Sequence, residues 1–199
     1  MADLTTKAKV KSFLGIASGV TTYDTLFDTL CKNVSALIER YCNRTFTETS
    51  YTEYFDVNSG DEYVFLRNFP VASLTSVKYR TGPYSAIVWQ DFNANDYLLY
   101  ESRGRIKFCV RLPEADKYIQ VVYTGGYKID FTHETDPLLH TLPGDLEQIA
   151  TEWVAKIYNM RKAQGILSES TEGQSITFKE SNSGKEFRDG LSSYKNILI

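Results

Sequence analysis

The sequence predicts an α+β protein with three parts: a helical core of long antiparallel helices, an inserted small antiparallel β-sandwich or barrel-like domain, and an extended C-terminal tail. The period of the apolar residues changes from about 3.6 to 2 near residue 47 and returns to about 3.6 after Pro137. The connections between the expected strands are too short for crossover helices, which favours antiparallel pairing. We therefore assign 1–46 and 137–167 to the helical core, 47–136 to the β-domain and 168–199 to a flexible tail.

Two helices are expected before residue 47. Thr5 or Thr6 can cap a short helix that stops at Gly15. Asp24 can cap a second helix of about 20 residues, about 30 Å long, with an apolar stripe along one face. The stripe consists of Phe27, Leu30, Cys31, Val34, Leu37, Ile38 and Tyr41. Because a helix with one such stripe is not stable alone, we expect it to pack on the late helix.

Six or seven short strands are expected in the β-domain. Alternation of apolar and polar residues is clearest from Ile106 to Leu112, and a second alternating run precedes Gly125. The other strand-like runs are Tyr51–Asp56, Tyr63–Leu66, Leu74–Arg80, Ala86–Gln90 and Tyr97–Tyr100. In the strand from Ile106 to Leu112 and just before it, four cations occupy alternate positions, so their side chains should point to one face of the sheet. They are Arg103, Arg105, Lys107 and Arg111. This basic face is either solvated or in contact with an acidic partner or a nucleic acid backbone.

A second long helix is expected from Pro143 to Lys162. Proline is tolerated in a first turn, and Asp145 and Glu147 follow where the helix dipole favours acids. Its apolar face consists of Leu146, Ile149, Ala150, Trp153, Val154, Ile157 and Tyr158. The segment from Ser168 to Ile199 is polar and buries little surface by itself, so we expect it to be mobile until it meets a partner.

Composition and charge exclude several classes of protein. The 199 residues include 22 Lys+Arg and 25 Asp+Glu, a formal net charge of −3, which argues against a protein that mainly neutralises phosphates. No apolar run approaches the roughly 20 residues of a membrane helix, and the N-terminus lacks the pattern of a signal peptide, so we expect a soluble intracellular product. The three cysteines have no CxxC spacing, and we expect them to be reduced and mostly buried.

Catalytic patterns are sparse in this sequence. The two histidines, His133 and His140, flank Pro137, which breaks any helix that could align them on a metal ion. Neither a GxSxG elbow nor a P-loop pattern is present. We therefore expect no metal and no cofactor, and a hydrolase built on His133 or His140 is only the third interpretation.

Five segments carry a resemblance to a known family through their order and spacing. They are Thr6–Ile16 (TKAKVKSFLGI), Leu37–Phe46 (LIERYCNRTF), Asn68–Val71 (NFPV), Val122–Tyr127 (VYTGGY) and Leu142–Leu146 (LPGDL), the last opening the helix that runs to Arg161. Over residues 6 to about 165 the chain resembles the head-tail connector (adaptor or head completion) proteins of tailed bacteriophages and prophages.

The resemblance implies a structural protein without catalysis or cofactor. It implies a homo-oligomeric ring, of twelve subunits, beneath the portal at the capsid–tail junction of a virion made in the bacterial cytoplasm. Double-stranded DNA would pass through the ring without sequence-specific binding, and a stopper or tail-completion protein would attach to it; no membrane is involved. In this family the C-terminal segment commonly reaches the portal, so we assign portal binding, as a hypothesis, to Phe178, Phe187, Leu191 and Tyr194.

The main rival interpretation is a ligand- or carbohydrate-binding β-module of another virion protein. It requires exposed aromatic side chains, such as Tyr84 or Trp89, to gather on one surface. The basic face, Arg103 to Arg111, would more naturally meet a protein than DNA in the connector interpretation, because a conduit for DNA should not hold it.

Overall fold

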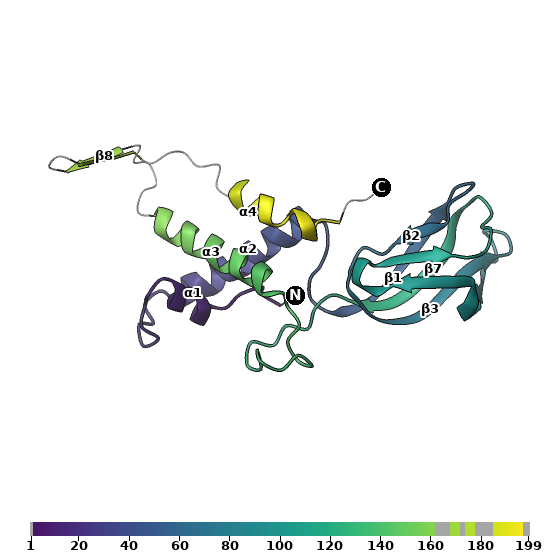
Figure 1. Ribbon diagram of the computed structural model, residues 1–199, viewed down its shortest axis with the longest axis horizontal. Helices are drawn as coiled ribbons and strands as arrows, with labels where there is room; N and C mark the ends of the chain where they lie inside the picture. The colour runs from purple at the N-terminus through teal and green to yellow at the C-terminus, as the bar shows by residue number, and fades with distance from the viewer. Residues whose placement is uncertain (1, 162–167, 172–173, 178–184, 197–199) are drawn as a thin grey trace. The chain divides into compact units, whose positions relative to one another are not determined.

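The computed structural model describes residues 2–161, 168–171, 174–177 and 185–196, and the chain forms two compact units. The helical unit comprises Met1–Asn43 with Leu142–Ile199, and the β-unit comprises Arg44–Thr141. The helices and the antiparallel sheets confirm the expected mixed α+β class (Figure 1). None of the helices within these described ranges has both the length and the apolar character needed to cross a membrane.

The helical unit contains four helices in the part of the chain that is described. They are α1 (Lys7–Phe13), α2 (Asp24–Cys42), α3 (Gly144–Met160) and α4 (Lys185–Gly190). Thr6 caps α1, because its side chain accepts a hydrogen bond from the main-chain N–H of Lys9. Asn43 ends α2 in the left-handed conformation, at φ 53°, a position that suits asparagine.

The long helices α2 and α3 pack on each other through their apolar stripes. Phe27, near the start of α2, contacts Tyr158, near the end of α3, with ring centroids 4.8 Å apart. The opposite ends of the two helices meet a common segment: Asn196 donates to the Cys42 carbonyl, and Tyr194 donates to Asp145. The two helices therefore run antiparallel. Two residues before α1, the Thr5 hydroxyl forms a hydrogen bond with the Thr151 hydroxyl of α3.

Part of the segment expected to be mobile is folded against these helices. Phe187 of α4 stacks on Trp153 of α3, with centroids 5.3 Å apart and planes at 14°. Leu191, which follows α4, is fully buried. These apolar residues lie one helical turn apart, so α4 has a small apolar face of its own. The 3₁₀ turn η4 (Ser192–Tyr194) follows, and the hairpin β8 (Ser168–Thr171) with β9 (Gln174–Thr177) precedes α4.

The β-unit contains two antiparallel sheets. The four-stranded sheet has the order β1-β7-β3-β4, and the three-stranded sheet has the order β2-β6-β5. The strands are β1 (Thr49–Val57), β2 (Tyr63–Phe65), β3 (Val71–Thr81), β4 (Val88–Asp91), β5 (Tyr97–Tyr100), β6 (Arg105–Phe108) and β7 (Ala115–Gly125), with 3₁₀ turns η1 (Ala94–Asp96) and η2 (Glu101–Arg103). Strand β7 is central, because it pairs with β1 on one side and with β3 on the other.

Both sheets contribute to one hydrophobic core. The alternate residues that face inward include Val121 and Tyr123 of β7 and Ile106 and Phe108 of β6. Tyr123 is buried with its hydroxyl donating to Glu53 at 2.7 Å and accepting from the main-chain N–H of Asn68 at 3.1 Å. Burial and the hydrogen bond to Glu53 raise the pKa of Tyr123 well above its usual range, so the phenol stays neutral. Its two hydrogen bonds link β1 to the segment between β2 and β3.

Strand β6 is shorter than the predicted strand from Ile106 to Leu112. It ends at Phe108, and the chain bends at Cys109, whose main-chain N–H donates to the Asp96 carbonyl at 2.7 Å. Pro113 follows closely and supplies no N–H to a ladder. Val110 is consequently exposed, and the expectation that Cys109 is buried was wrong, whereas Cys31 and Cys42 are buried as free thiols.

Candidate functional site

The two histidines lie in the loop that follows β7, where they contribute to its folding. His133 Nδ1 lies 2.8 Å from the Asp130 carboxylate and 2.9 Å from the Thr132 hydroxyl. Both contacts use the same ring nitrogen, whereas a nucleophile–base–acid relay needs one partner on each nitrogen. Hydrogen bonds from Thr132 and His133 hold the pKa of Asp130 well below its usual range. Across the described ranges, no three His, Cys, Asp or Glu side chains are placed to hold a metal ion.

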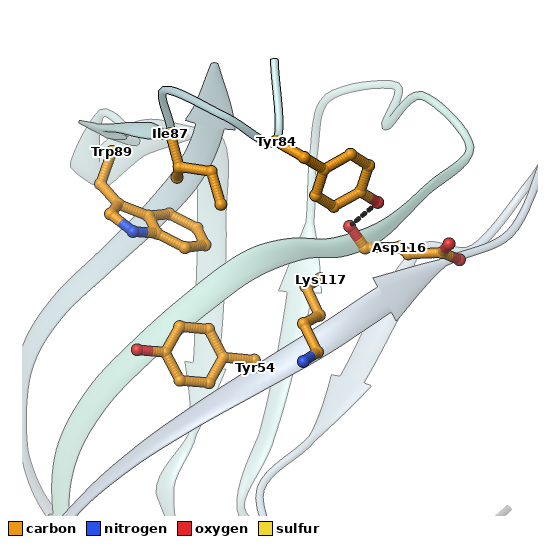
Figure 2. Close-up of a pocket in the computed structure, with 6 residues that line it drawn as sticks. All are labelled: Tyr54, Tyr84, Ile87, Trp89, Asp116 and Lys117. Carbon is orange, nitrogen blue, oxygen red and sulfur yellow. Dashed lines mark hydrogen bonds between the residues drawn. The ribbon is translucent and has the colours of Figure 1, made fainter. Parts of the chain in front are cut away.

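An aromatic pocket of about 620 Å³ lies on the β-unit (Figure 2). We use the name aromatic pocket for its lining residues, which are Tyr54, Tyr84, Ile87, Trp89, Asp116 and Lys117. The rings of Tyr54 and Trp89 lie 5.7 Å apart at 46°, and Tyr54 is 50% and Tyr84 63% exposed. Figure 2 shows the Lys117 side chain extending toward Tyr54, and the Asp116 carboxylate pointing away from the rings. The pocket is therefore an open aromatic surface with one ammonium group beside it.

A β-bulge places the charged residues of the pocket. The register of β1 against β7 shifts between Phe55 and Val57, and Lys117 adopts φ 45°, a conformation that few residues other than glycine adopt. The Asp56 carboxylate accepts a hydrogen bond from the Lys117 main-chain N–H at 2.6 Å and so fixes this conformation. A bulge re-aims the side chains of its strand, which here turns Asp116 and Lys117 in different directions.

The turn between β3 and β4 supplies the opposite side of the pocket. Gly82 has φ 78°, and a Cβ atom there would lie 2.6 Å from the Ala86 carbonyl oxygen, so only glycine fits. Tyr84 donates to the Asp116 carbonyl at 3.4 Å, and the Arg80 guanidinium lies 3.9 Å from the centre of the Tyr84 ring. The sequence therefore encodes the position of Tyr84 through a turn glycine and a cation–π contact.

The outer face of the three-stranded sheet is a second candidate surface, which we call the tyrosine–arginine face. Its residues are Tyr63, Phe65, Leu98, Tyr100, Arg105 and Lys107, and the pairings of β6 with β2 and β5 place them side by side. The Arg105 guanidinium carbon lies 4.2 Å from the Tyr100 ring centre and 5.0 Å from that of Tyr63. Lys107 lies 5.7 Å from the Tyr63 ring centre and 4.0 Å from the Glu62 carboxylate. The aromatic rings contact both cations, so this surface is amphipathic.

The four cations predicted to share one face do not all do so. Arg105 and Lys107 belong to the tyrosine–arginine face, whereas Arg103 lies in η2 and Arg111 lies beyond the end of β6. Arg103 and Arg111 are therefore outside the strand pairing that positions Arg105 and Lys107.

The residues assigned to portal binding also divide. Phe187 and Leu191 are buried in the helical unit, and Tyr194 donates to Asp145 at 2.6 Å. Phe178 lies outside the described residues. In this structure the two buried side chains act by holding α4 in place, and portal binding by this segment stays a prediction.

Sequence reasoning named Tyr84 and Trp89, and the structure brings them together. It missed Tyr54 and Lys117 of the pocket, and it missed the tyrosines that flank Arg105. A sequence signal existed for the tyrosines, because Tyr63 and Phe65, like Leu98 and Tyr100, alternate as outward positions in neighbouring strands. No local signal marks the pocket, since its residues come from three strands and a turn.

Comparisons with known proteins identify a family from the sequence and similar folds among solved structures. Residues 3–197 match the family described as Head completion protein. No curated protein sequence matches the chain. The chain is similar in fold to a chain of the virion of a native gene transfer agent (GTA) particle, with 16% identity and a TM-score of 0.59, covering 96% of this chain and 89% of that one.

Two further solved structures show the same likeness. One is the neck of a native GTA particle computed with C12 symmetry, at 17% identity and a TM-score of 0.55, covering 96% of this chain and 88% of that one. The other is the neck of an empty GTA particle computed with C6 symmetry, at 16% identity and a TM-score of 0.54, covering 96% and 89%.

Proposed function

The chain belongs to the head completion protein family, and from this membership we propose that it forms a ring at the neck of a tailed phage-like particle, where it connects the portal to the tail proteins. It is a structural protein of the particle and not an enzyme. The observation that carries the proposal is the family match, which runs over residues 3–197 and so includes both units.

The proposed assembly is a closed ring of twelve subunits. The similar chains come from particle necks reconstructed with C6 and C12 symmetry, which supports a cyclic arrangement. A ring requires each subunit to present two different surfaces, because head-to-tail contacts close only at the right rotation. The long helices α2 and α3 give the rigid frame on which such surfaces can be fixed.

Charge supports a passage for DNA and not a DNA-binding surface. The chain has a formal net charge of −3 at pH 7. A negative lumen repels the phosphate backbone weakly and lets the duplex slide, whereas a basic lumen would hold it. We expect no measurable affinity for double-stranded DNA at physiological salt.

We assign the contact with a stopper or tail-completion protein to the tyrosine–arginine face. Exposed tyrosine and arginine side chains are the residues that most often dominate the energy of protein interfaces. The guanidinium of Arg105 is held between two tyrosine rings and is fixed in orientation before any partner arrives. Such a group favours a carboxylate, which it can bind through two hydrogen bonds.

Point substitutions test this face. Arg105→Ala should weaken the complex with the tail-side protein at least tenfold, the size typical of an interface anchor. Arg111→Ala is the matched control, because Arg111 lies outside the β6 pairing and should change the affinity little. Equal affinities of the two variants would remove the tyrosine–arginine face from the proposal.

The mass of the purified protein, measured by light scattering alone and then with its portal protein, tests the connector function itself. Twelve copies of the 22.7 kDa chain have a mass of about 272 kDa. A ring alone, or a monomer that forms a stable complex with the portal, supports the proposal. A monomer that ignores the portal contradicts it.

The C-terminal contact with the portal needs a separate experiment, because removing residues 168–199 would also remove α4 from its place on α3. Replacing 168–184 by a Gly/Ser sequence of equal length keeps α4 and removes Phe178 and the hairpin. Loss of portal binding in this variant, with an unchanged melting temperature, supports a portal contact by that segment. Unchanged portal binding contradicts it.

A further inference from the structure

The loop that follows β7 carries the most exposed large apolar side chain in the described structure. Leu138 is 72% exposed and Leu139 is 42% exposed. We call these two residues the leucine tip. An apolar pair held in water costs free energy unless a partner covers it, so the leucine tip is a candidate contact.

The loop is folded so that the leucine tip is held in one position. Lys128 and Thr141 close its base with two hydrogen bonds of 2.9 Å: the Lys128 main-chain N–H donates to the Thr141 side-chain hydroxyl, and the Thr141 main-chain N–H donates to the Lys128 carbonyl. At the tip, the Asp136 carboxylate accepts from the Leu138 main-chain N–H at 2.9 Å, and Lys128 Nζ donates to the Leu138 carbonyl at 3.0 Å. A contact presented in a fixed geometry loses less entropy on binding than a mobile one.

The leucine tip and the aromatic pocket belong to opposite ends of the four-stranded sheet. Asp116 lies at the start of β7, and the loop begins after Gly125 at its end. Nine residues of strand separate these positions, which at about 3.4 Å per residue is about 30 Å. Because the base of the loop is closed, the leucine tip does not fold back to the pocket of its own chain.

The two surfaces match in polarity and charge. The pocket offers aromatic rings and a volume of about 620 Å³, which is ample for two leucine side chains. The ammonium group of Lys117 lies beside the rings, whereas the Asp116 carboxylate points away from them (Figure 2), and the Arg80 guanidinium contacts the Tyr84 ring. The loop is acidic, since residues 127–141 contain three carboxylates, at Asp130, Glu134 and Asp136, against the one ammonium group of Lys128.

We infer that the leucine tip of one subunit docks in the aromatic pocket of the next copy of the chain. The inference rests on the proposed ring and names one of its subunit contacts. The two complementary surfaces are different and lie at opposite ends of one sheet, so the contact is head-to-tail and leaves a joined pair with one free leucine tip and one free aromatic pocket. Contacts of this type continue from subunit to subunit until a ring closes.

Cysteine cross-linking tests the contact directly. In a Cys109→Ser background, which removes the exposed thiol, one variant carries Leu138→Cys and another carries Ile87→Cys. Mixed and assembled, alone or on the portal, the two variants should form a disulfide-linked dimer, and neither variant alone should do so. A wild-type-sized assembly without the mixed dimer overturns the inference, as does a dimer from either variant alone, which would indicate a two-fold contact.

Assembly measurements give a second, independent test. Leu138→Asp should raise the concentration needed for assembly at least tenfold, and Val20→Asp, at an exposed apolar residue of the helical unit, should leave it unchanged. If Leu138→Asp assembles like the wild type, the inference fails and the ring proposal stands. If the wild type never assembles, the ring proposal fails and the inference fails with it. A third result would also overturn the inference: the wild type binds an oligosaccharide, Trp89→Ala does not, and Trp89→Ala still assembles normally. The pocket would then be assigned to a glycan.

Discussion

Truncating Leu191 should release α4 from the helical unit. Leu191 is fully buried, and a Leu→Ala substitution at such a position costs about 2–5 kcal/mol through lost transfer free energy and the cavity that remains. The loss falls first on the docking of α4, which also depends on the Phe187–Trp153 stack, on the Tyr41 hydroxyl that donates to the Arg188 carbonyl, and on the hydrogen bonds of Tyr194 and Asn196. At 1.4 kcal/mol per factor of ten, even the lower figure raises the detached population about 30-fold.

Limited proteolysis measures that population. Trypsin cleaves after Arg188 within α4 only when the helix is open, and the rate follows the open population when opening is fast relative to cleavage. Leu191→Ala should therefore be cut at Arg188 about 30 times faster than the wild type. Ser193→Ala, at an exposed position of the same segment, is the control and should be cut at the wild-type rate.

Fluorescence gives a second readout of the same event. The chain has two tryptophans, so Trp89→Phe leaves Trp153 as the only indole. Trp153 is buried under Phe187, and its emission should shift to the red and become open to quenching by acrylamide when α4 detaches. If Leu191→Ala changes neither the cleavage rate nor the Trp153 emission, the reasoning that Leu191 anchors α4 is wrong.

Three further predictions concern thiols, acid and a turn. In the native protein a thiol reagent should modify the exposed Cys109 and leave Cys31 unreacted, because burial raises the pKa of Cys31 to about 12. Mass spectrometry identifies the modified residue, and rapid labelling of Cys31 would contradict its burial. Because the folded loop lowers the pKa of Asp130, the ionised carboxylate stabilises the loop at pH values above the usual carboxyl pKa of about 4, and this stabilisation is lost as the pH falls toward the lowered pKa. Hydrogen exchange of the loop amides should therefore become faster in acid. Asp130→Asn should show fast exchange already at neutral pH. Gly82→Ala should lower the unfolding free energy by about 1–3 kcal/mol because of its positive φ and the close Ala86 carbonyl, whereas Gly144→Ala, in open space at the start of α3, should not destabilise; urea unfolding compares the two.

The helices and most strands could be predicted because their signals are local. A stripe at a period of about 3.6 marks α2 and α3, and each needs only one apolar partner face. Thr6 was one of two predicted caps, and the structure selects it. Local rules failed where a residue's neighbour in space decides the outcome, as at Phe108, where the bend to Asp96 ends β6.

The segment that contains α4 shows where composition alone misleads. Its polar composition predicted mobility, yet Phe187 and Leu191 recur at helical spacing; Phe187 stacks on Trp153 of α3, and Leu191 is buried. Composition averages over a segment and hides two apolar residues on one face. The packing partner lies more than 30 residues earlier in the chain, so only the folded structure identifies it.

The aromatic pocket could be predicted only in part. Tyr84 and Trp89 were candidates because a ligand-binding module requires exposed aromatic side chains that gather on one surface. Their meeting depends on the order β1-β7-β3-β4 and on the bulge at Lys117, and neither follows from periodicity. The comparisons identify the family, and the pairing of strands identifies the surfaces.

The division of the chain into one continuous and one interrupted unit sets an order for biosynthesis. The β-unit is a single stretch, Arg44–Thr141, so all its strands are available once residue 141 has left the ribosome. The helical unit is split, and α2 has no α3 to pack on until the chain has grown well past residue 141. The last residue of α3 is Met160, 19 residues later, a delay of roughly 1–4 s at 5–20 residues per second. During this interval the apolar stripe of α2 is uncovered, and the nascent chain is at its most vulnerable to aggregation and to capture by chaperones.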